Sequence, residues 1–214
     1  MFVDIHTHHA TDSGQPAIRN LTFPEADTVF SSDQEGLFSL GFHPWYAGEF
    51  TIQLMDKLMV WSADERFVAV GECGLDKNSK VPFDVQLQVF ERQIILSENI
   101  LKPLIVHCVG SFNELFQLKK HLHPHQPWII HGFRGKPELA GQALQAGCSL
   151  SFGEHFNPES VHVTPIGSLF VETDQSQLSI TEIYQSISSA KHCNVQDLDA
   201  GENFIRQTRQ NIYH

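Results

Sequence analysis

Short apolar runs that end in polar residues recur along the chain and predict β-strands. Their content of Val, Ile, Leu and Phe is typical of strands that are buried on both faces of a parallel sheet. The chain contains eight such runs: FVDIHTH (residues 2–8), ADTVFSS (26–32), GLFSLGFHP (36–44), FVAVGECGLD (67–76), PLIVHCVG (103–110), PWIIHGFRG (127–135), GCSLSFGE (147–154) and SLFVETD (168–174).

Apolar residues recur at helical spacing between most of these runs. Strands that alternate with helices, without a repeat, linker or low-complexity segment, predict a single α/β domain over residues 1–214. Eight strands in such a chain predict a (β/α)8 barrel. The predicted helices cover residues 51–67, 81–100, 111–122 and 135–147, and one or two closing helices are expected in the last 35 residues.

The expected barrel is trimmed around its first two strands. Residues 9–25, which follow the first predicted strand, show no helical period. Between the second and third predicted strands there is room only for a loop. We therefore expect no helix in either of these two connections.

The charge of the chain limits the kinds of substrate that it can bind. The chain carries 14 basic and 25 acidic residues, a formal net charge of −11. This balance argues against a broad electrostatic surface for nucleic acid. It leaves open a nucleic acid that is held by metals at one point.

The remaining composition indicates a protein of a reducing compartment. Its four cysteines, Cys73, Cys108, Cys148 and Cys193, are scattered without a CxxC pair, so neither a disulfide framework nor a thiolate zinc site is predicted. The first predicted strand starts at Phe2, and no apolar stretch approaches the length of a membrane span. We expect a cytoplasmic protein without membrane contacts, as a monomer or weak oligomer.

Potential metal ligands gather at the C-terminal ends of the apolar runs. In a parallel barrel these strand ends converge on one face, which carries the active site. Separate structural histidines have no reason to follow this order. The residues that lie at or just past a strand end are His6, His8, His43, Glu72, His107, His131 and Asp174.

The opening segment DIHTH places metal-binding groups on alternate residues. In a strand, Asp4, His6 and His8 point to the same side, so the two imidazoles can chelate one ion. Asp4 lies deeper and is expected to orient a ligand histidine as a hydrogen-bond acceptor. Asp76, by contrast, is interpreted as the cap of a loop.

Four histidines and two carboxylates are more than one tetrahedral ion needs. They fit two divalent ions about 3.5–4 Å apart that share a bridging carboxylate and a bridging water, and Glu72 on a middle strand is the natural bridge. Mixed imidazole and carboxylate ligands suit zinc, manganese, magnesium, nickel or iron, so the ligand set does not identify the metal.

An ordered series of motifs resembles the TatD family of metal-dependent hydrolases. The series occurs in the order of that family and spans about four fifths of the chain. It consists of DIHTH at the start, GFHP at 41–44, GECGLD at 71–76, a helix with Gln86, Phe90 and Gln93 that leads to KPLIVH at 102–107, HGF at 131–133 and ETD at 172–174.

The resemblance implies a distorted TIM barrel that holds two divalent metals and acts on phosphodiesters, often as a deoxyribonuclease. It also implies a role for each matching residue. His6 and His8 would hold one metal with Asp174, His107 and His131 would hold the other, Glu72 would bridge the two, and His43 would lie at the substrate phosphate.

The departures from the family pattern concern the substrate and not the metals. The histidine of the fifth strand is usually followed by Ser-Arg, and here Cys108 and Val109 follow it. Arg134 stands where the family usually has serine after HxF, and it is expected to bind substrate in place of the missing arginine. The segment after ETD also lacks the usual Asn-Glu-Pro loop. The hydrolase prediction is therefore better supported than the deoxyribonuclease prediction.

The expected chemistry is attack by a metal-bound hydroxide on a phosphate or acyl centre. Asp174 would act as general base, and together with the bridging Glu72 it forms the predicted catalytic pair. The expected substrates are DNA ends, short single strands, or a small phosphoester or ester. Three alternatives stay open: an amidohydrolase, a deacylase acting on aminoacyl esters, and a degenerate barrel that binds metal without turnover.

Overall fold

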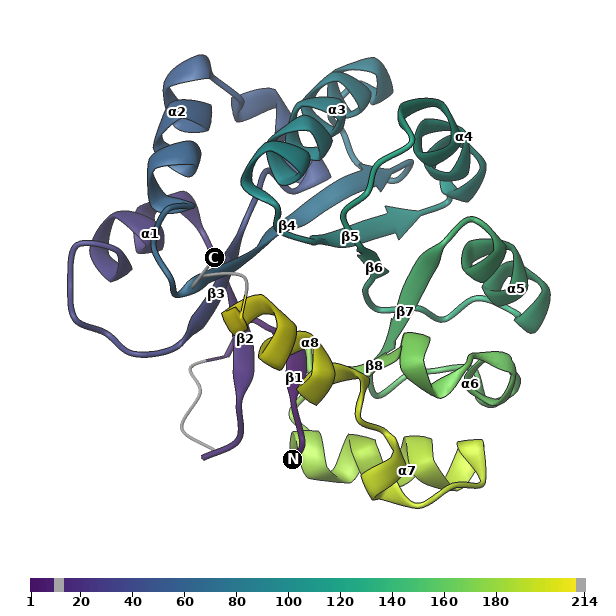
Figure 1. Ribbon diagram of the computed structural model, residues 1–214. Coiled ribbons are helices and arrows are strands. Elements are labelled where there is room, and N and C mark those ends of the chain that lie inside the picture. The colour runs from purple at the N-terminus through teal and green to yellow at the C-terminus, as the bar shows by residue number, and fades with distance from the viewer. Residues whose placement is uncertain (10–13, 211–214) are drawn as a thin grey trace. The chain divides into compact units, whose positions relative to one another are not determined.

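The computed structural model describes residues 1–9 and 14–210 (Figure 1). Eight strands follow one another in the sheet in chain order, and helices lie between most of them. This is the alternation that the sequence predicts. The strands are β1 (Asp4–Thr7), β2 (Ala17–Leu21), β3 (Leu37–Leu40), β4 (Phe67–Asp76), β5 (Leu104–Val109), β6 (Trp128–Ile130), β7 (Cys148–Phe152) and β8 (Leu169–Val171).

The described part of the chain contains α-helices and three short 3-10 helices. No helix of this part is long and apolar enough to cross a membrane. The α-helices are α1 (Phe23–Val29), α2 (Ile52–Trp61), α3 (Phe83–Ile100), α4 (Phe112–Leu122), α5 (Pro137–Gln145), α6 (Pro158–Val163), α7 (Ile180–Lys191) and α8 (Ala200–Gln210), and the 3-10 helices are η1 (Pro44–Glu49), η2 (Ile166–Ser168) and η3 (Val195–Asp197).

The chain forms two compact units. Unit 1 comprises residues 1–19 and 129–214, and unit 2 comprises residues 20–128. Unit 1 therefore contains the first strand and the last two, whereas β3, β4 and β5 lie in unit 2. Each unit has its own set of strand ends with polar residues.

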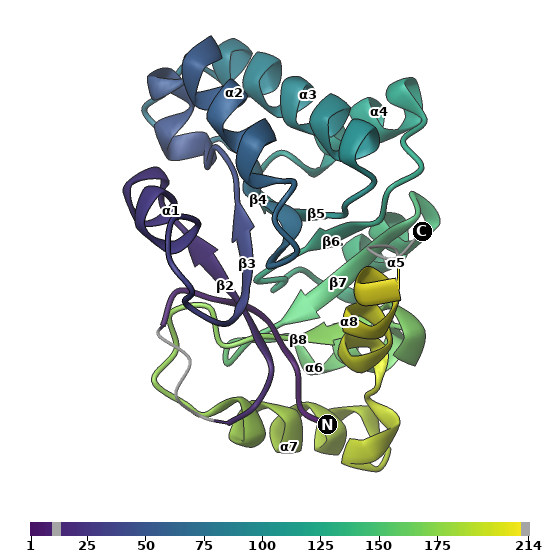
Figure 2. The same cartoon turned by 60° about the vertical axis from the view of Figure 1, so that its left-hand side comes forward.

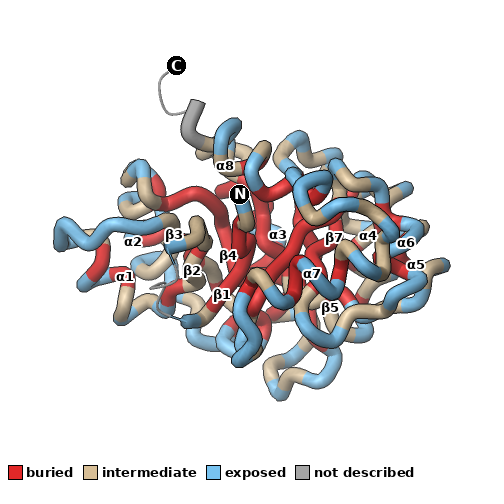
Figure 3. Tube along the Cα trace, turned by 90° about the horizontal axis from the view of Figure 1, so that it is seen from below, coloured by how far each residue is buried: buried red, intermediate tan, exposed pale blue. Residues whose placement is uncertain are grey.

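In unit 2, helices α2, α3 and α4 cover one face of β4 and β5 (Figures 1 and 2). Every residue of β4 is buried, and the tube through β4 is red in Figure 3. Gly74 is required for the pairing of β4 with β5, because a Cβ at this position would lie 2.0 Å from the carbonyl oxygen of His107. This close approach aligns Gly74 on β4 with His107 on β5, whose Nδ1 lies 2.8 Å from the carboxylate of Glu72.

In unit 1, the first strand is held between β8 and helix α7. The hydroxyl of Tyr184 on α7 donates a hydrogen bond to the carbonyl of Val3 at 3.0 Å and accepts one from its N–H at 3.3 Å. Thr7 forms a parallel bridge with Asp174, just past the end of β8. The first and last strands of the chain are therefore joined in register.

The prediction of the second strand is wrong. Residues 26–29 of the segment ADTVFSS belong to α1, and the second strand is Ala17–Leu21, in a segment where no element was predicted. Helix α1 begins with a reciprocal capping box between Thr22 and Glu25, which favours helix at this point. The trimmed connection is thus the first one, where no helix lies among the described residues between β1 and β2.

Candidate metal centres

The first cluster of potential ligands lies in unit 1 at the end of β1, and we call it the β8 cluster: His6, His8, His131, Glu172 and Asp174. Two backbone hydrogen bonds build it, from the N–H of Asp174 to the carbonyl of His6 at 3.0 Å and from the N–H of His8 to the carbonyl of Asp174 at 3.1 Å. They bring the Asp174 carboxylate to 3.5 Å from His8 Nε2 and 3.8 Å from His6 Nε2. Ligand atoms of these three residues all lie within 4.8 Å of one another.

Glu172 belongs to the β8 cluster although its position was not singled out in the sequence. Its carboxylate is fully buried, accepts a hydrogen bond from the N–H of Gly132 at 2.6 Å and lies 3.5 Å from His131 Nδ1. Burial raises the pKa of Glu172, but the nearby His131, together with His6 and Ser151, outweighs this effect and lowers the pKa. The alternation that pairs His6 with His8 also places Glu172 with Asp174, so the signal was present in ETD.

Asp4 does not contact a histidine side chain in any described hydrogen bond, which corrects its expected role. Its carboxylate accepts hydrogen bonds from the N–H of Thr173 at 3.0 Å and from the Thr173 hydroxyl at 2.6 Å. Burial raises the pKa of Asp4 to about 7, and the bonds from Thr173 only partly oppose this effect. Asp4 therefore holds Thr173, the residue that precedes Asp174, and does not orient an imidazole in these hydrogen bonds.

The second cluster lies in unit 2, and we call it the β4 cluster: His43, Glu72, Asp76 and His107. His107 Nδ1 lies 2.8 Å from one oxygen of Glu72, and His43 Nε2 lies 3.1 Å from the same oxygen. The other ring nitrogen of His107 lies 3.2 Å from Asp76. His107 is thus enclosed by two carboxylates at hydrogen-bond distance.

Asp76 is both a loop cap and a member of the β4 cluster. One carboxylate oxygen accepts a hydrogen bond from the N–H of Asn78 at 2.7 Å, which is the predicted cap. The other oxygen accepts a hydrogen bond from Trp45 Nε1 at 2.6 Å. Burial raises the pKa of Asp76, but these bonds and the contact with His107 outweigh burial and lower it. The side chain is accordingly stabilised as a carboxylate.

Two buried glutamines of α3 position the β4 cluster. Gln93 accepts a hydrogen bond from the N–H of Phe42 at 2.6 Å and donates one to its carbonyl at 3.1 Å, next to His43. Gln86 holds the N–H and carbonyl of Asp76 in the same way, at 2.9 and 3.1 Å. Seven residues, two helical turns, separate the glutamines, so both face the strand ends. In the sequence, these two polar residues stand on an otherwise apolar face of the predicted helix, and this pattern could have indicated their role.

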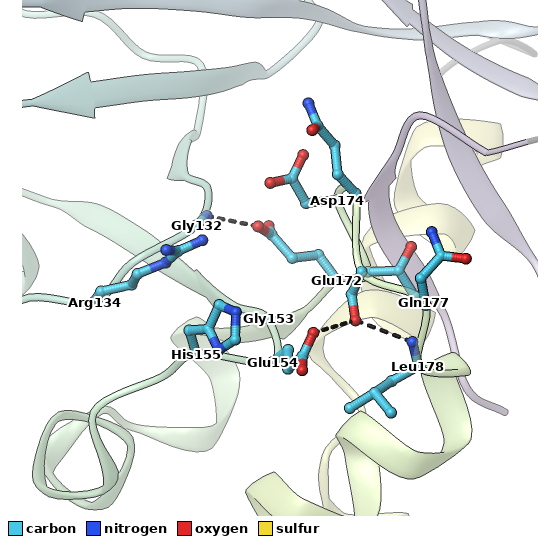
Figure 4. A pocket seen from close by; sticks show the side chains of 12 residues that line it. Gly132, Arg134, Gly153, Glu154, His155, Glu172, Asp174, Gln177 and Leu178 are labelled. Atoms are coloured by element: carbon cyan, nitrogen blue, oxygen red, sulfur yellow. Dashed lines mark hydrogen bonds between the residues drawn. The ribbon is translucent and has the colours of Figure 1, made fainter. Parts of the chain in front are cut away.

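Arg134 lines a pocket beside the β8 cluster in unit 1. The pocket has a volume of about 450 Å³, and its lining includes Glu172 and Asp174. Figure 4 shows Arg134 and His155 on one side of it, facing the carboxylates of Glu172 and Asp174 on the other. A cation opposite metal-binding carboxylates suits an anionic group of a substrate.

The spacing around Asp174 in the β8 cluster is close to what a divalent ion requires. Two ligand atoms that each lie ~2.1 Å from one tetrahedral ion are ~3.4 Å apart. The distances of 3.5 and 3.8 Å between Asp174 and the two imidazoles are close to this value. Within the β4 cluster, three ligand atoms from His43, Glu72 and His107 also lie within 4.8 Å of one another. Nitrogen and carboxylate donors without thiolates suit the divalent metals that the sequence predicts.

The predicted ligands therefore fall into two groups. His6, His8, His131 and Asp174 lie in unit 1, and Glu72 and His107 lie in unit 2, together with His43. Bridging by Glu72 and a shared ion for His107 and His131 would join residues of different units, and these two assignments stay predictions.

Comparisons with known proteins agree with these observations. A family model described as TatD related DNase matches residues 4–196. The chain is 32% identical over 145 residues to an uncharacterized metal-dependent hydrolase, YabD, of Bacillus subtilis, a match that covers 64% of the chain and 57% of the relative. It is 29% identical over 112 residues to the 3'-5' ssDNA/RNA exonuclease TatD of Erwinia billingiae, which covers 51% of the chain and 43% of the relative. The chain thus spans about half the length of these curated relatives.

A solved structure shares the whole fold. The crystal structure of YjjV, a TatD homologue from Escherichia coli, matches with a TM-score of 0.78 over 99% of this chain and 95% of that chain, at 20% identity. At this identity the likeness shows the fold alone. Together with the strand order it confirms the predicted TIM-barrel class.

Proposed function

Because the chain belongs to the TatD related DNase family, we propose that it is a metal-dependent hydrolase that cleaves phosphodiester bonds in nucleic acid. The observation that carries this proposal is the pair of histidine and carboxylate clusters at strand ends, each with three possible ligand atoms within 4.8 Å. The relative from Erwinia billingiae, named a 3'-5' ssDNA/RNA exonuclease, supports single strands as the substrate class.

The side chains would divide the work between binding metal and binding substrate. His6, His8 and Asp174 would hold one divalent ion, and Glu72 and His107 would contribute to a second. Bound ions of this kind lower the pKa of water and withdraw charge from a phosphate oxygen. Asp174, with its side chain 27% exposed, can accept a proton from an attacking water.

His43 and Arg134 would bind the substrate. His43 keeps Nε2 toward Glu72, while its Nδ1 accepts a hydrogen bond from the N–H of Trp45 at 3.1 Å, so its ring orientation is fixed. Arg134 would supply a positive charge to an anionic group in the pocket beside Glu172 and Asp174.

The proposal includes two features of organisation. The family match runs through both compact units, which supports a single domain over residues 1–214. A cytoplasmic location agrees with four cysteines that form no disulfide. We also propose that the protein is a monomer or a weak oligomer.

The test uses untagged protein, stripped of metal by a chelator and then loaded with each candidate metal. An end-labelled single-stranded DNA, its RNA counterpart, an aminoacyl ester and a cyclic amide are offered as substrates. We expect that a strand is cleaved and that this cleavage requires metal. Cleavage should be lost in Asp174→Asn and His107→Ala. It should persist in His121→Ala, which replaces an exposed histidine of α4. Metal binding without any turnover would favour a degenerate barrel, and turnover of the ester or amide alone would favour one of the alternative hydrolases.

A further inference from the structure

Two aromatic side chains are exposed next to the β4 cluster. Trp45 and Tyr46, neighbours in η1, are 55% and 57% exposed. All other aromatic residues whose side chains the structure describes are buried or half-buried. Leaving two large rings in water forgoes the favourable burial of their apolar area. A ligand that covers them would recover this free energy.

The ring of Trp45 is held in place and not merely exposed. Its Nε1 donates a hydrogen bond to Asp76 at 2.6 Å, and its backbone N–H donates to His43 Nδ1 at 3.1 Å. The backbone of Tyr46 is held by a hydrogen bond from its N–H to the carbonyl of His43 at 2.9 Å. A fixed ring loses little conformational entropy when a ligand stacks on it.

The exposed rings of Trp45 and Tyr46 lie next to His43 of the β4 cluster. The ring centroids of His43 and Trp45 lie 5.2 Å apart, and those of His43 and Tyr46 lie 6.0 Å apart. The ring of His43 in turn lies 4.5 Å from that of His107. A phosphate at His43 would therefore have its neighbouring base within reach of Trp45 or Tyr46.

We propose that Trp45 and Tyr46 form a stacking surface for the bases of a single-stranded nucleic acid. The inference rests on the proposed function and adds how the strand is recognised. Base stacking on aromatic rings is tolerant of sequence, because every base has a π-face. It also suits a chain with a net charge of −11, which has few cations for contacts with many phosphates. Affinity for the strand then comes mainly from bases and depends only weakly on salt.

Tryptophan fluorescence in the presence of a chelator tests the proposal without cleavage. Trp128 is fully buried and Trp61 half-buried, so Trp45 is the most exposed of the three tryptophans. A short single-stranded oligonucleotide should decrease the emission in a saturable way. An abasic strand of the same length carries the same charge and should leave the emission unchanged. The decrease should disappear in Trp45→Phe, which keeps an aromatic ring but removes this fluorophore.

Variants give a second readout. Trp45→Ala and Tyr46→Ala should each weaken binding of the base-containing strand ~10–100-fold, measured by anisotropy of a labelled strand, and leave binding of the abasic strand unchanged. Trp45→Phe should retain most of the affinity. Val60→Ala removes a side chain of α2 that is 72% exposed, and it should alter neither strand's binding. Circular dichroism checks that each variant is folded, and Tyr46→Ala removes no hydrogen bond of Trp45.

The outcomes separate this proposal from the proposed function. The stacking surface would be ruled out if the alanine variants weakened binding of the base-containing and the abasic strand equally. It would also be ruled out if both strands decreased the emission equally. A metal-dependent cleavage that the two alanine variants do not change would overturn it as well and leave the hydrolase intact. Base-dependent loss of Trp45 emission in a protein that cleaves no strand would support the surface and contradict the nuclease.

Discussion

The β8 cluster and the β4 cluster carry similar side chains but hold them in different ways. In the β8 cluster the Asp174 carboxylate lies 3.5 and 3.8 Å from two imidazoles, beyond hydrogen-bond distance, and backbone pairing keeps it there. In the β4 cluster Glu72 lies 2.8 Å from His107 and 3.1 Å from His43. The imidazoles therefore lie farther from the Asp174 carboxylate in the β8 cluster than from the Glu72 carboxylate in the β4 cluster.

This difference has a consequence for metal affinity. An ion that enters the β8 cluster finds the Asp174 carboxylate and two imidazoles at distances close to those that a tetrahedral ion requires. An ion that enters the β4 cluster must first replace hydrogen bonds between ligands, and each such bond to a charged group contributes about 1.5–3 kcal/mol. We expect the β8 cluster to bind the tighter of two ions.

The largest expected effect concerns Asp174. Asp174→Asn keeps the side-chain shape, and asparagine tolerates the left-handed backbone at this position, where φ is +53°. The change removes the proton acceptor, so turnover of a single strand should fall by ~10²–10⁴-fold. Steady-state kinetics measure the loss. The matched variant Asp56→Asn, on an exposed turn of α2, should keep its activity, and full activity in Asp174→Asn would rule out the assigned role.

The next prediction compares the two clusters directly by metal titration. His8→Ala removes a ligand of the β8 cluster and should abolish the tighter binding event. His107→Ala should abolish the weaker one and leave the tighter one in place. Isothermal titration of chelator-stripped protein with Zn²⁺ or Mn²⁺ gives both affinities. Loss of the weaker event in His8→Ala would reverse the ranking of the clusters.

A smaller effect is expected from the glutamine that supports only the β4 cluster. Gln93→Leu removes both partners of the Phe42 backbone and leaves a buried N–H and a buried carbonyl unsatisfied. Each such group costs ~1–3 kcal/mol, so the free energy of unfolding should fall by ~2–6 kcal/mol. Urea unfolding measures it. Gln93→Glu retains the acceptor for the N–H of Phe42 and should be less destabilising at low pH, where the acid is protonated.

The smallest effect concerns the pH dependence of stability at Asp4, which holds Thr173 next to the β8 cluster. The pKa of Asp4 is about 7 in the folded protein and near 3.8 in the unfolded chain. Between these values the folded state binds more protons, so the contribution of Asp4 to the free energy of unfolding decreases as the pH rises toward 7. Asp4→Asn removes this contribution. From pH 5 to pH 8, the free energy of unfolding of Asp4→Asn should rise by ~2 kcal/mol relative to that of the wild type.

Urea unfolding of both proteins in the presence of a chelator gives this difference, since a bound metal would also respond to pH. Curves for wild type and Asp4→Asn that shift in parallel with pH would show that Asp4 does not titrate in this range. Gln93→Leu serves as the reference, because its change lies in unit 2 and removes no ionisable group.

The sequence by itself determined the class of the fold and the types of ligand. Seven of the eight predicted strands lie where they were expected, because their apolar runs are continuous and end in polar residues. Alternate spacing placed His6 and His8 on one side of β1, and the positions at strand ends indicated most of the other potential ligands, although not Glu172. These features are local, so a reader of the chain can see them.

Tertiary structure decided which polar residues meet. The second strand was misjudged because AIRNL is short and carries Arg19 and Asn20, whose polarity hides a strand; Asn20 accepts a hydrogen bond from the N–H of Glu72, 52 residues away. The contact of Asp76 with Trp45 and the clamp of Gln93 on Phe42 likewise join residues far apart in the chain. Such partners are chosen by packing of separate elements, and no local pattern of hydrophobic and polar residues encodes them.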